Sequence, residues 1–297
     1  GIGAYHLTLG RNKKSVELDL KSEEGLKLFK ELAEVADVVV DNFSQGVTKR
    51  LGIDHQSLKE VNPKIITCSI SGFGDTEVNR PAYDNLIQGY AGAMSITGTD
   101  KENPVKSGIP IADLGAGLYA VIGILSAIQS REKNDSGEHV DISMLDTQVS
   151  LLTYMATMHF LSGENPEPIG NQHMNHVPFN SYRTSDGFIQ IGVVAEDFWP
   201  SLIEALDLRQ LDTEENKTRI GRLKNREHID QAVQEVFITN TTEHWLKILQ
   251  EHRVPCGPIN TLSETFQDAD LLKRNMIVEV LQDSGTSVKM PGNPVKI

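Results

Sequence analysis

The chain has 297 residues, of which 39% are hydrophobic and 23% charged, a balance typical of a folded globular protein. Its formal net charge of −13 disfavours nucleic acids and anionic membrane surfaces as partners. The sequence contains no apolar run that approaches the ~20 residues of a membrane span, so we expect no membrane partner.

The two cysteines, Cys68 and Cys256, form no metal-binding spacing. Because no secretory signal pattern is present, we expect both thiols to be reduced and the protein to be cytoplasmic. The chain opens on Gly1 without an initiator methionine, and we expect it to begin inside a domain.

Strands and helices alternate through the first half of the chain. The predicted strands are Ser15–Leu20, Asp37–Val40, Lys64–Ile70 and His139–Met144, and the predicted helices are Ser22–Ala33, Ser57–Val61, a long apolar helix from Asp113 to Arg131, and a last one ending near Phe160. This alternation predicts a parallel α/β sheet, in which ligands bind at the carboxyl ends of the strands. Those ends are Asp41–Gly46 and Ser71–Gly74.

The pattern changes after residues 162–177, which are rich in Gly, Pro and Asn and predict a linker. Beyond it, Tyr182–Val194 predicts a hairpin around a Ser-Asp-Gly turn. Helices are predicted at Phe198–Leu206, Arg226–Phe237 and Thr242–His252, and strands at Val278–Leu281 and Ser287–Met290. We therefore expect a smaller α+β unit after the linker.

Asp113 is the most informative residue, because it stands before the small residues Gly115, Ala116 and Gly117 and an apolar helix. A carboxylate there faces the free N–H groups of the helix start, and the glycines allow another molecule to approach the backbone. This context suits an ionised nucleophile in a dry cleft. The alternative is that Asp113 only caps the helix, which is the commoner role of a lone aspartate.

Other catalytic and binding motifs are missing from the sequence. It has no phosphate-binding Gly-x-x-x-x-Gly-Lys loop, no dinucleotide-binding Gly-x-Gly-x-x-Gly and no Gly-x-Ser-x-Gly nucleophile turn. His173 and His176 are close together, but no acid or cysteine completes a metal site, so we expect no metal.

Several segments, taken in order, resemble the class III CoA-transferase family, which includes formyl-CoA, carnitine and dicarboxylate CoA-transferases. They are Arg11–Lys21, Asp41–Gly52, Pro81–Asp84, Ile111–Gly117, Val140–Asp146, Tyr182–Gly187 and Val254–Ile259. Each motif is weak alone, but their order and spacing extend over almost the whole chain.

The resemblance implies that Asp113 attacks an acyl-CoA thioester and forms first an aspartyl anhydride and then an aspartyl-CoA thioester. CoA is then a substrate rather than a permanently bound cofactor. The family positions that line the CoA site correspond to Leu18, Lys21, Asn42, Phe43, Arg50, Tyr83 and Met144. Lys21 and Arg50 would meet phosphates, whereas without the resemblance Lys21 reads as a surface charge and Phe43 and Met144 as core residues.

The resemblance also implies a fold, a set of domains and an assembly. Residues 1–161 and 262–297 would form a large Rossmann-like α/β domain lacking its N-terminal segment, with 162–177 as linker and 178–261 as a small α+β domain. Members of the family form interlocked homodimers.

The chain departs from the family pattern at two places. Ser44–Gly46 replaces a common Arg-Pro-Gly, so one cation is absent there, and Gly170–Pro178 stands where formyl-CoA transferase has a glycine-rich loop. The second departure argues against the formyl-CoA and oxalate substrate pair, and a dicarboxylate such as succinate is the expected acceptor. His173, Asn175 and His176 are the candidate contacts for the acceptor carboxylate.

Two other functions remain open. A racemase of the α-methylacyl-CoA type needs two acid/base groups beside the α carbon. Related racemases carry His where this chain has Tyr83, and their partner Glu falls near Ala195, with Glu196 one place out of register. The other alternative is a CoA-binding homologue that has lost catalysis.

Overall fold

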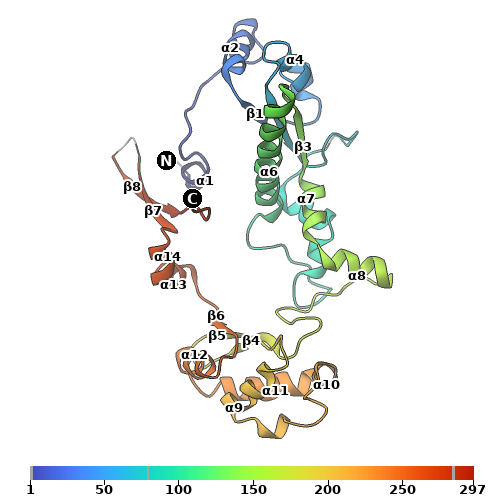
Figure 1. Cartoon of the computed structure of the whole chain (residues 1–297), viewed down its shortest axis with the longest axis vertical. Coiled ribbons are helices and arrows are strands. Elements are labelled where there is room, and N and C mark those ends of the chain that lie inside the picture. Colours follow the sequence, from blue (N-terminus) through green and yellow to red (C-terminus); the bar gives the residue numbers. More distant parts are fainter. Residues whose placement is uncertain (1–2, 79, 283–284) are drawn as a thin grey trace. The chain divides into compact units, whose positions relative to one another are not determined.

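The computed structural model describes residues 3–78, 80–282 and 285–297, which form two compact units (Figure 1). The parallel-sheet unit consists of Ser15–Gly170. The antiparallel-sheet unit joins the described residues of Gly1–Lys14 to those of Asn171–Ile297. Each unit has its own sheets and core.

The parallel-sheet unit is built on β1 (Val38–Asp41), β2 (Ile66–Ser71) and β3 (His139–Ser143), in the order β1-β2-β3. All pairings are parallel, with Val40 opposite Cys68 and Cys68 opposite Val140. The predicted mixed α/β fold with a parallel sheet is therefore confirmed. Parallel pairing requires crossover connections, and helices supply them here.

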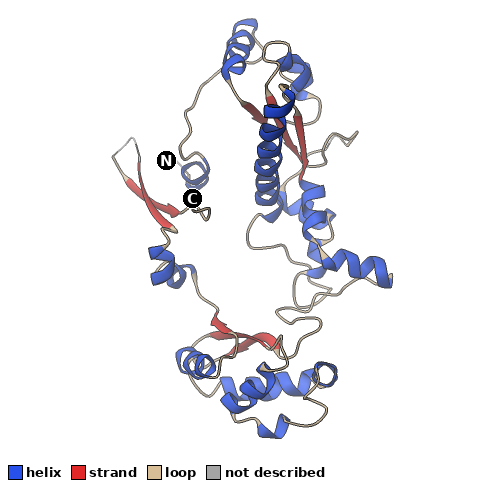
Figure 2. Ribbon diagram, viewed as in Figure 1, coloured by secondary structure: helices blue, strands red, loops and turns tan. Residues whose placement is uncertain are grey.

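Figure 2 shows the helices of this unit in blue and its three strands in red. They are α2 (Glu23–Val35), α3 (Val47–Leu51), α4 (His55–Lys59), α5 (Asp84–Tyr90), η1 (Ala93–Ile96), α6 (Ile111–Asn134), α7 (Met144–Leu151) and α8 (Tyr154–Ser162). Ser22 caps α2 as predicted, since its hydroxyl accepts a hydrogen bond from the Gly25 N–H.

Helix α6 lies along the sheet with small residues on its inner face. A Cβ placed on Gly123 would lie 2.6 Å from Val140 Cγ1, so the glycine permits close approach to β3. Its outer face leaves Leu118, Ile122 and Leu125 largely exposed. By length and composition alone α6 is long and apolar enough to cross a membrane, contrary to our expectation that no apolar run approaches that length. Its small-residue face packs on β2 and β3.

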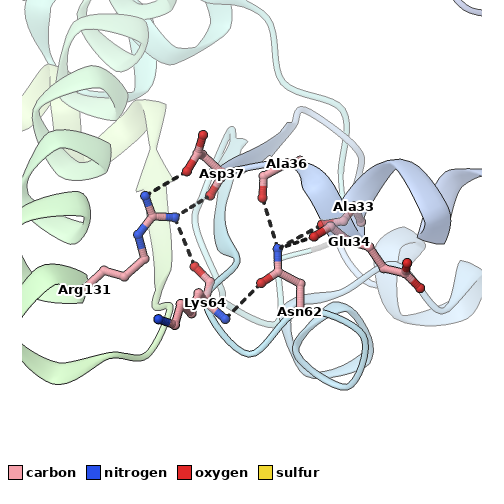
Figure 3. Close-up of polar contacts among 7 residues, drawn as sticks. All are labelled: Ala33, Glu34, Ala36, Asp37, Asn62, Lys64 and Arg131. Atoms are coloured by element: carbon pink, nitrogen blue, oxygen red, sulfur yellow. Dashed lines mark hydrogen bonds and ion pairs between the residues drawn. The ribbon is translucent and has the colours of Figure 1, made fainter.

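The end of α2 is tied to the loop before β2 by one side chain (Figure 3). The Asn62 amide donates to the carbonyls of Ala33, Glu34 and Ala36 at 3.0, 3.4 and 3.1 Å, and its oxygen accepts the Lys64 N–H at 3.1 Å. One amide thus satisfies carbonyls that the helix terminus leaves unpaired.

Arg131, near the end of α6, holds the start of β1 and the loop before β2 together (Figure 3). Its guanidinium donates to the carbonyls of Asp37 and Lys64 and pairs with the Asp37 carboxylate at 2.9 Å. The amino-terminal ends of the strands are therefore fastened to α6, whose other end carries Asp113.

The antiparallel-sheet unit contains two small sheets. The order β4 (Phe179–Arg183), β5 (Phe188–Gly192), β6 (Cys256–Pro258) makes one, and β7 (Ile277–Leu281) pairs with β8 (Ser287–Pro291) in the other. The helices are α1 (Ala4–Leu9), α9 (Phe198–Leu206), η2 (Arg209–Leu211), α10 (Arg219–Lys224), α11 (Arg226–Phe237), α12 (Thr242–Glu251), α13 (Leu262–Thr265) and α14 (Ala269–Lys273). The predicted hairpin and three of these helices are confirmed.

Two predicted elements are wrong. Residues 15–20 form no strand, because alternation alone makes no sheet and no described strand pairs with them; Val16 is 67% exposed. The helix predicted to end near Phe160 is broken between α7 and α8, where Thr153 has a φ of 50°.

The compact units divide the chain after Lys14 and Gly170, the second point lying within the predicted linker 162–177. Residues 262–297 group with the start of the chain, where Arg11 donates to the Pro291 carbonyl at 3.1 Å. The assignment of 262–297 to one domain with 1–161, and of 178–261 to another, stays a prediction.

Asn62→Ala should lower the free energy of unfolding by about 1–3 kcal/mol, the usual cost of leaving partly buried polar groups without a partner. Urea denaturation measures this change. Gln56→Ala, on the exposed face of α4, is the control and should have almost no effect. Equal stability of the two variants would show that the Asn62 bonds contribute nothing.

Candidate active site

Asp113 lines a cavity of about 230 Å³ in the parallel-sheet unit. The other lining residues follow β1 and β2 or belong to the stretch before α5 and the start of α7: Asn42, Phe43, Ser44, Gln45, Ser71, Gly72, Phe73, Gly74, Val78, Arg80, Pro81, Ala82, Tyr83 and Met144. Both strand ends predicted to hold a ligand, Asp41–Gly46 and Ser71–Gly74, contribute to this cavity. The cavity is small by the standard of ligand sites, so it suits the reacting end of a larger molecule.

Four of the seven predicted CoA-binding residues share the cavity with Asp113. They are Asn42, Phe43, Tyr83 and Met144. Phe43 and Tyr83 are 43% and 68% exposed, so these aromatic surfaces are open to a ligand, whereas Met144 is buried. Their role in CoA binding stays a prediction.

The other three predicted CoA-binding residues do not line the cavity. Leu18 and Lys21 lie in the irregular segment before α2, and Arg50 is exposed on α3. A Cβ placed on Gly46 would lie 3.6 Å from Arg50 Nη1, so this guanidinium lies against the turn that follows β1. Leu18 and Lys21 have no comparable link to the cavity.

His173 and His176 belong to the antiparallel-sheet unit. Their ring centroids are 4.6 Å apart, and Arg226 donates to the His173 carbonyl at 2.7 Å. Burial, the neighbouring His176 and the charge of Arg226 lower the pKa of His173, which favours its neutral form. Their contact with a substrate acid stays a prediction.

The environment of Asp113 differs from the expected one. Helix α6 begins at Ile111, with Pro110 before it, so Asp113 stands in the first turn and does not cap the helix. The predicted small-residue turn is helical. A Cβ on Gly115 would lie 2.9 Å from Thr147 Cγ2, so this glycine serves the packing of α7 against α6, whereas Gly117 faces open space.

Asp84 takes the place at the helix start that the sequence suggested for Asp113. Its Oδ1 accepts the N–H of Ala112 at 2.9 Å and that of Asp113 at 3.4 Å, and its Oδ2 accepts the Gln88 amide at 2.6 Å. Gln88 in turn accepts the Ser107 N–H. Asp84 is adjacent to Tyr83 in sequence, but nothing local marks it as a cap for a helix 27 residues later in the chain.

Asp113 is exposed rather than enclosed in the dry cleft that we expected. The pKa of its carboxyl is raised, first by partial burial and then by the negative charge of Asp84. The backbone N–H groups of Ala112 and Asp113 are hydrogen-bonded to Asp84. The Asp113 carboxylate therefore accepts no capping hydrogen bond that would stabilise its negative charge. A carboxylate with a raised pKa is more basic and therefore a better nucleophile once it is ionised.

Glu196 is placed to stabilise structure rather than to act as an acid/base group. Its carboxylate accepts a hydrogen bond from the buried guanidinium of Arg222 at 2.8 Å and the N–H of Arg219 at 3.2 Å. The racemase alternative loses its nearest candidate for the second group.

The parallel sheet places Asp113 and the exposed rings of Phe43 and Tyr83 beside the carboxyl ends of the strands, where α/β enzymes bind their ligands. The model of CoA-transferase family III matches residues 1–297. The chain belongs to this family, and the predictions of the family and of a CoA-transferase are confirmed.

Curated relatives agree with this assignment. The chain is 32% identical to the human succinyl-CoA:glutarate CoA-transferase and to the Agrobacterium fabrum succinate–glutarate CoA-transferase, over 98% of its length and 67% and 74% of theirs. It is also 32% identical to the Haloarcula hispanica succinyl-CoA:mesaconate CoA-transferase, over 99% of its length and 76% of that relative.

A solved structure supports the fold. The crystal structure of a CAIB/BAIF family protein from Brucella suis matches with a TM-score of 0.85 and 33% identity, over 96% of this chain and 75% of that one.

Asp84→Asn should move the acidic limb of the kcat/KM profile to lower pH. The amide keeps an acceptor for the Ala112 N–H but removes the charge that raises the Asp113 pKa, so Asp113 stays ionised at lower pH. The measurement is the pH dependence of CoA transfer. Asp146→Asn, an exposed acid in the first turn of α7, is the control. A limb that stays in place or moves to higher pH would contradict this account.

Proposed function

We propose that this chain transfers CoA from an acyl-CoA thioester to a carboxylic acid, with dicarboxylates as substrates and Asp113 as the nucleophile. The observation that carries the proposal is that Asp113, with a raised pKa, shares one small cavity with Asn42, Phe43, Tyr83 and Met144. Relatives named for succinyl-CoA with glutarate or mesaconate support the choice of dicarboxylates.

The chemistry proceeds by exchange at carbonyl carbons. An Asp113 oxygen attacks the thioester carbon, the C–S bond breaks, and CoA leaves as thiolate. The acyl group is then joined to the Asp113 carboxyl as a mixed anhydride. The thiolate attacks the aspartyl carbonyl carbon, the anhydride C–O bond breaks, and the first acid leaves as carboxylate. An aspartyl-CoA thioester remains.

The second half repeats these steps with the acceptor. Its carboxylate attacks the aspartyl thioester and releases thiolate, and the thiolate then attacks the acyl carbon of the acceptor and frees the Asp113 carboxylate. No net proton is consumed, so the cycle requires a nucleophile and water exclusion rather than an acid/base pair. The two mixed anhydrides and the aspartyl-CoA thioester would otherwise hydrolyse.

CoA enters as a substrate in this proposal, and no permanently bound cofactor is required. The cavity holds the thioester end, with Phe43 and Tyr83 as apolar surfaces beside it. Arg50, next to the turn after β1, supplies a cation for a CoA phosphate. Leu18 and Lys21 extend the CoA site in the predicted arrangement.

We also propose that the protein is a homodimer, interlocked as in the family it belongs to. The exposed apolar side chains of α6, among them Leu118, Ile122 and Leu125, support a partner surface there. Sedimentation velocity would give a dimer for the wild-type protein and a larger monomer fraction for Ile122→Glu. A wild-type monomer would contradict this assembly.

Asp113→Asn and Asp113→Ala should each reduce CoA transfer from succinyl-CoA to glutarate by at least about a thousandfold, the scale expected when a covalent nucleophile is removed. Chromatography of the CoA esters measures the product. Glu132→Gln, an exposed acid near the other end of α6, is the matched control. Full activity without Asp113 would reject the proposal. So would a wild-type enzyme that transfers no CoA but exchanges α-protons of acyl-CoA with solvent.

A further inference from the structure

Arg80 is a cation in the Asp113 cavity that neither the predicted CoA site nor the proposed mechanism uses. Its guanidinium carbon lies 4.7 Å from the ring centroid of Phe73 and 4.3 Å from that of Tyr90. These two rings meet edge to face, with centroids 5.8 Å apart and an interplanar angle of 82°. Contact with two aromatic rings restricts the plane of the guanidinium and shields part of it from water.

The N–H donors of the Arg80 guanidinium are not used by described protein groups. Within residues 3–78, 80–282 and 285–297, its guanidinium makes neither an ion pair nor a hydrogen bond to protein. Among the lining residues Asp113 supplies the single carboxylate and Arg80 the single arginine or lysine. The two side chains are not paired with each other, so each is available to a ligand.

A guanidinium fixed in this way is suited to a planar anion. Arginine binds carboxylates through two parallel N–H···O bonds, and loss of water around the pair strengthens the attraction. In the proposed reaction one carboxylate of the substrate reacts at Asp113. A dicarboxylate brings a second charge into the same cavity, and burial of that charge requires a cation.

We propose that Arg80 binds the non-reacting carboxylate of a dicarboxylate substrate while the other end of that substrate reacts at Asp113. This inference rests on the proposed function and adds to it the residue that selects two acid groups over one. Phe73 and Tyr90 are positioning residues, since they hold the guanidinium and need not touch the substrate.

The phosphates of CoA are the other anions that Arg80 would bind. They are separated from the CoA sulfur by the whole pantetheine arm, and a cavity of about 230 Å³ that contains the nucleophile is too small for both ends. A substrate carboxylate therefore fits the Arg80 site better than a CoA phosphate does. If Arg80 binds the carboxylate, its substitution impairs transfer to glutarate, and if it binds a phosphate, its substitution weakens CoA binding.

The test compares glutarate with its monomethyl ester, which has nearly the same size and one charge fewer. For the wild-type enzyme, kcat/KM for CoA transfer from succinyl-CoA should be higher with glutarate than with the ester. Arg80 is exposed in the absence of a ligand. Arg80→Gln should lower the value for glutarate by about 10- to 100-fold, the scale of a lost hydrogen bond between charged groups, and remove most of the preference. Arg80→Lys keeps the charge without the planar guanidinium, so its kcat/KM for glutarate should lie between those of the wild type and Arg80→Gln.

CoA affinity, measured by calorimetry, separates the two occupants. Arg80→Gln should leave the Kd for CoA unchanged, whereas Arg50→Gln, at the predicted phosphate contact, should weaken it. A loss of CoA affinity in Arg80→Gln, equal losses for glutarate and the ester, or a wild-type enzyme without preference would each overturn the inference. Wild-type CoA transfer that still depends on Asp113 would leave the proposed function standing in all these cases.

Thermal unfolding of each variant guards against loss of structure. Tyr90→Leu gives a second test that keeps Arg80, because it removes one of the two rings that hold the guanidinium. It should reduce the preference for glutarate in the same direction as Arg80→Gln. An unchanged preference would show that the ring contact does not position Arg80 for substrate.

Discussion

The carboxylate of Asp84 at the start of α6 is the contact on which the candidate active site depends. It binds the N–H groups of Ala112 and Asp113 and thereby fixes where the helix begins. It also occupies the groups that would otherwise lower the Asp113 pKa, and its own charge raises that pKa. One side chain thus positions the nucleophile and adds to the effect of burial, which is the larger cause of the raised Asp113 pKa.

The packing of α6 fixes this contact relative to the rest of the unit. Close approach at Gly115 and Gly123 seats the helix against α7 and β3, and Arg131 fastens its far end to the loop and strand starts. Because α6 runs back along the parallel strands, its first turn with Asp113 lies at the carboxyl ends of β1 and β2. The cavity is a consequence of this arrangement, since its lining comes from those strand ends.

Sequence periodicity predicted the parallel sheet, the long apolar helix and the α+β character of the second unit, because these depend on local spacing of apolar residues. It failed at residues 15–20, where alternation without a pairing strand forms no sheet, and at Thr153, where a positive φ interrupts an apolar pattern. Both outcomes depend on the tertiary contacts of the segment rather than on its own amino-acid composition.

The candidate site likewise contains some residues that the sequence predicted and others that it did not. Asn42, Phe43, Tyr83 and Met144 were predicted by family resemblance and lie beside Asp113, whereas Leu18 and Lys21 do not line that cavity. Asp84 and Arg80 carry no local signal, because a cap for a distant helix and a stacked cation are recognised only by their partners. A search for acids and arginines beside Tyr83 would have included both.

In the proposed reaction Asp113 forms a covalent bond to CoA. Intact-protein mass spectrometry after mixing with succinyl-CoA tests it directly, followed by peptide mapping of the modified chain. We expect a CoA adduct on the peptide that contains Asp113, absent in Asp113→Ala and cleared by glutarate. An adduct on a different acid, or CoA transfer without any adduct on the pathway, would contradict it.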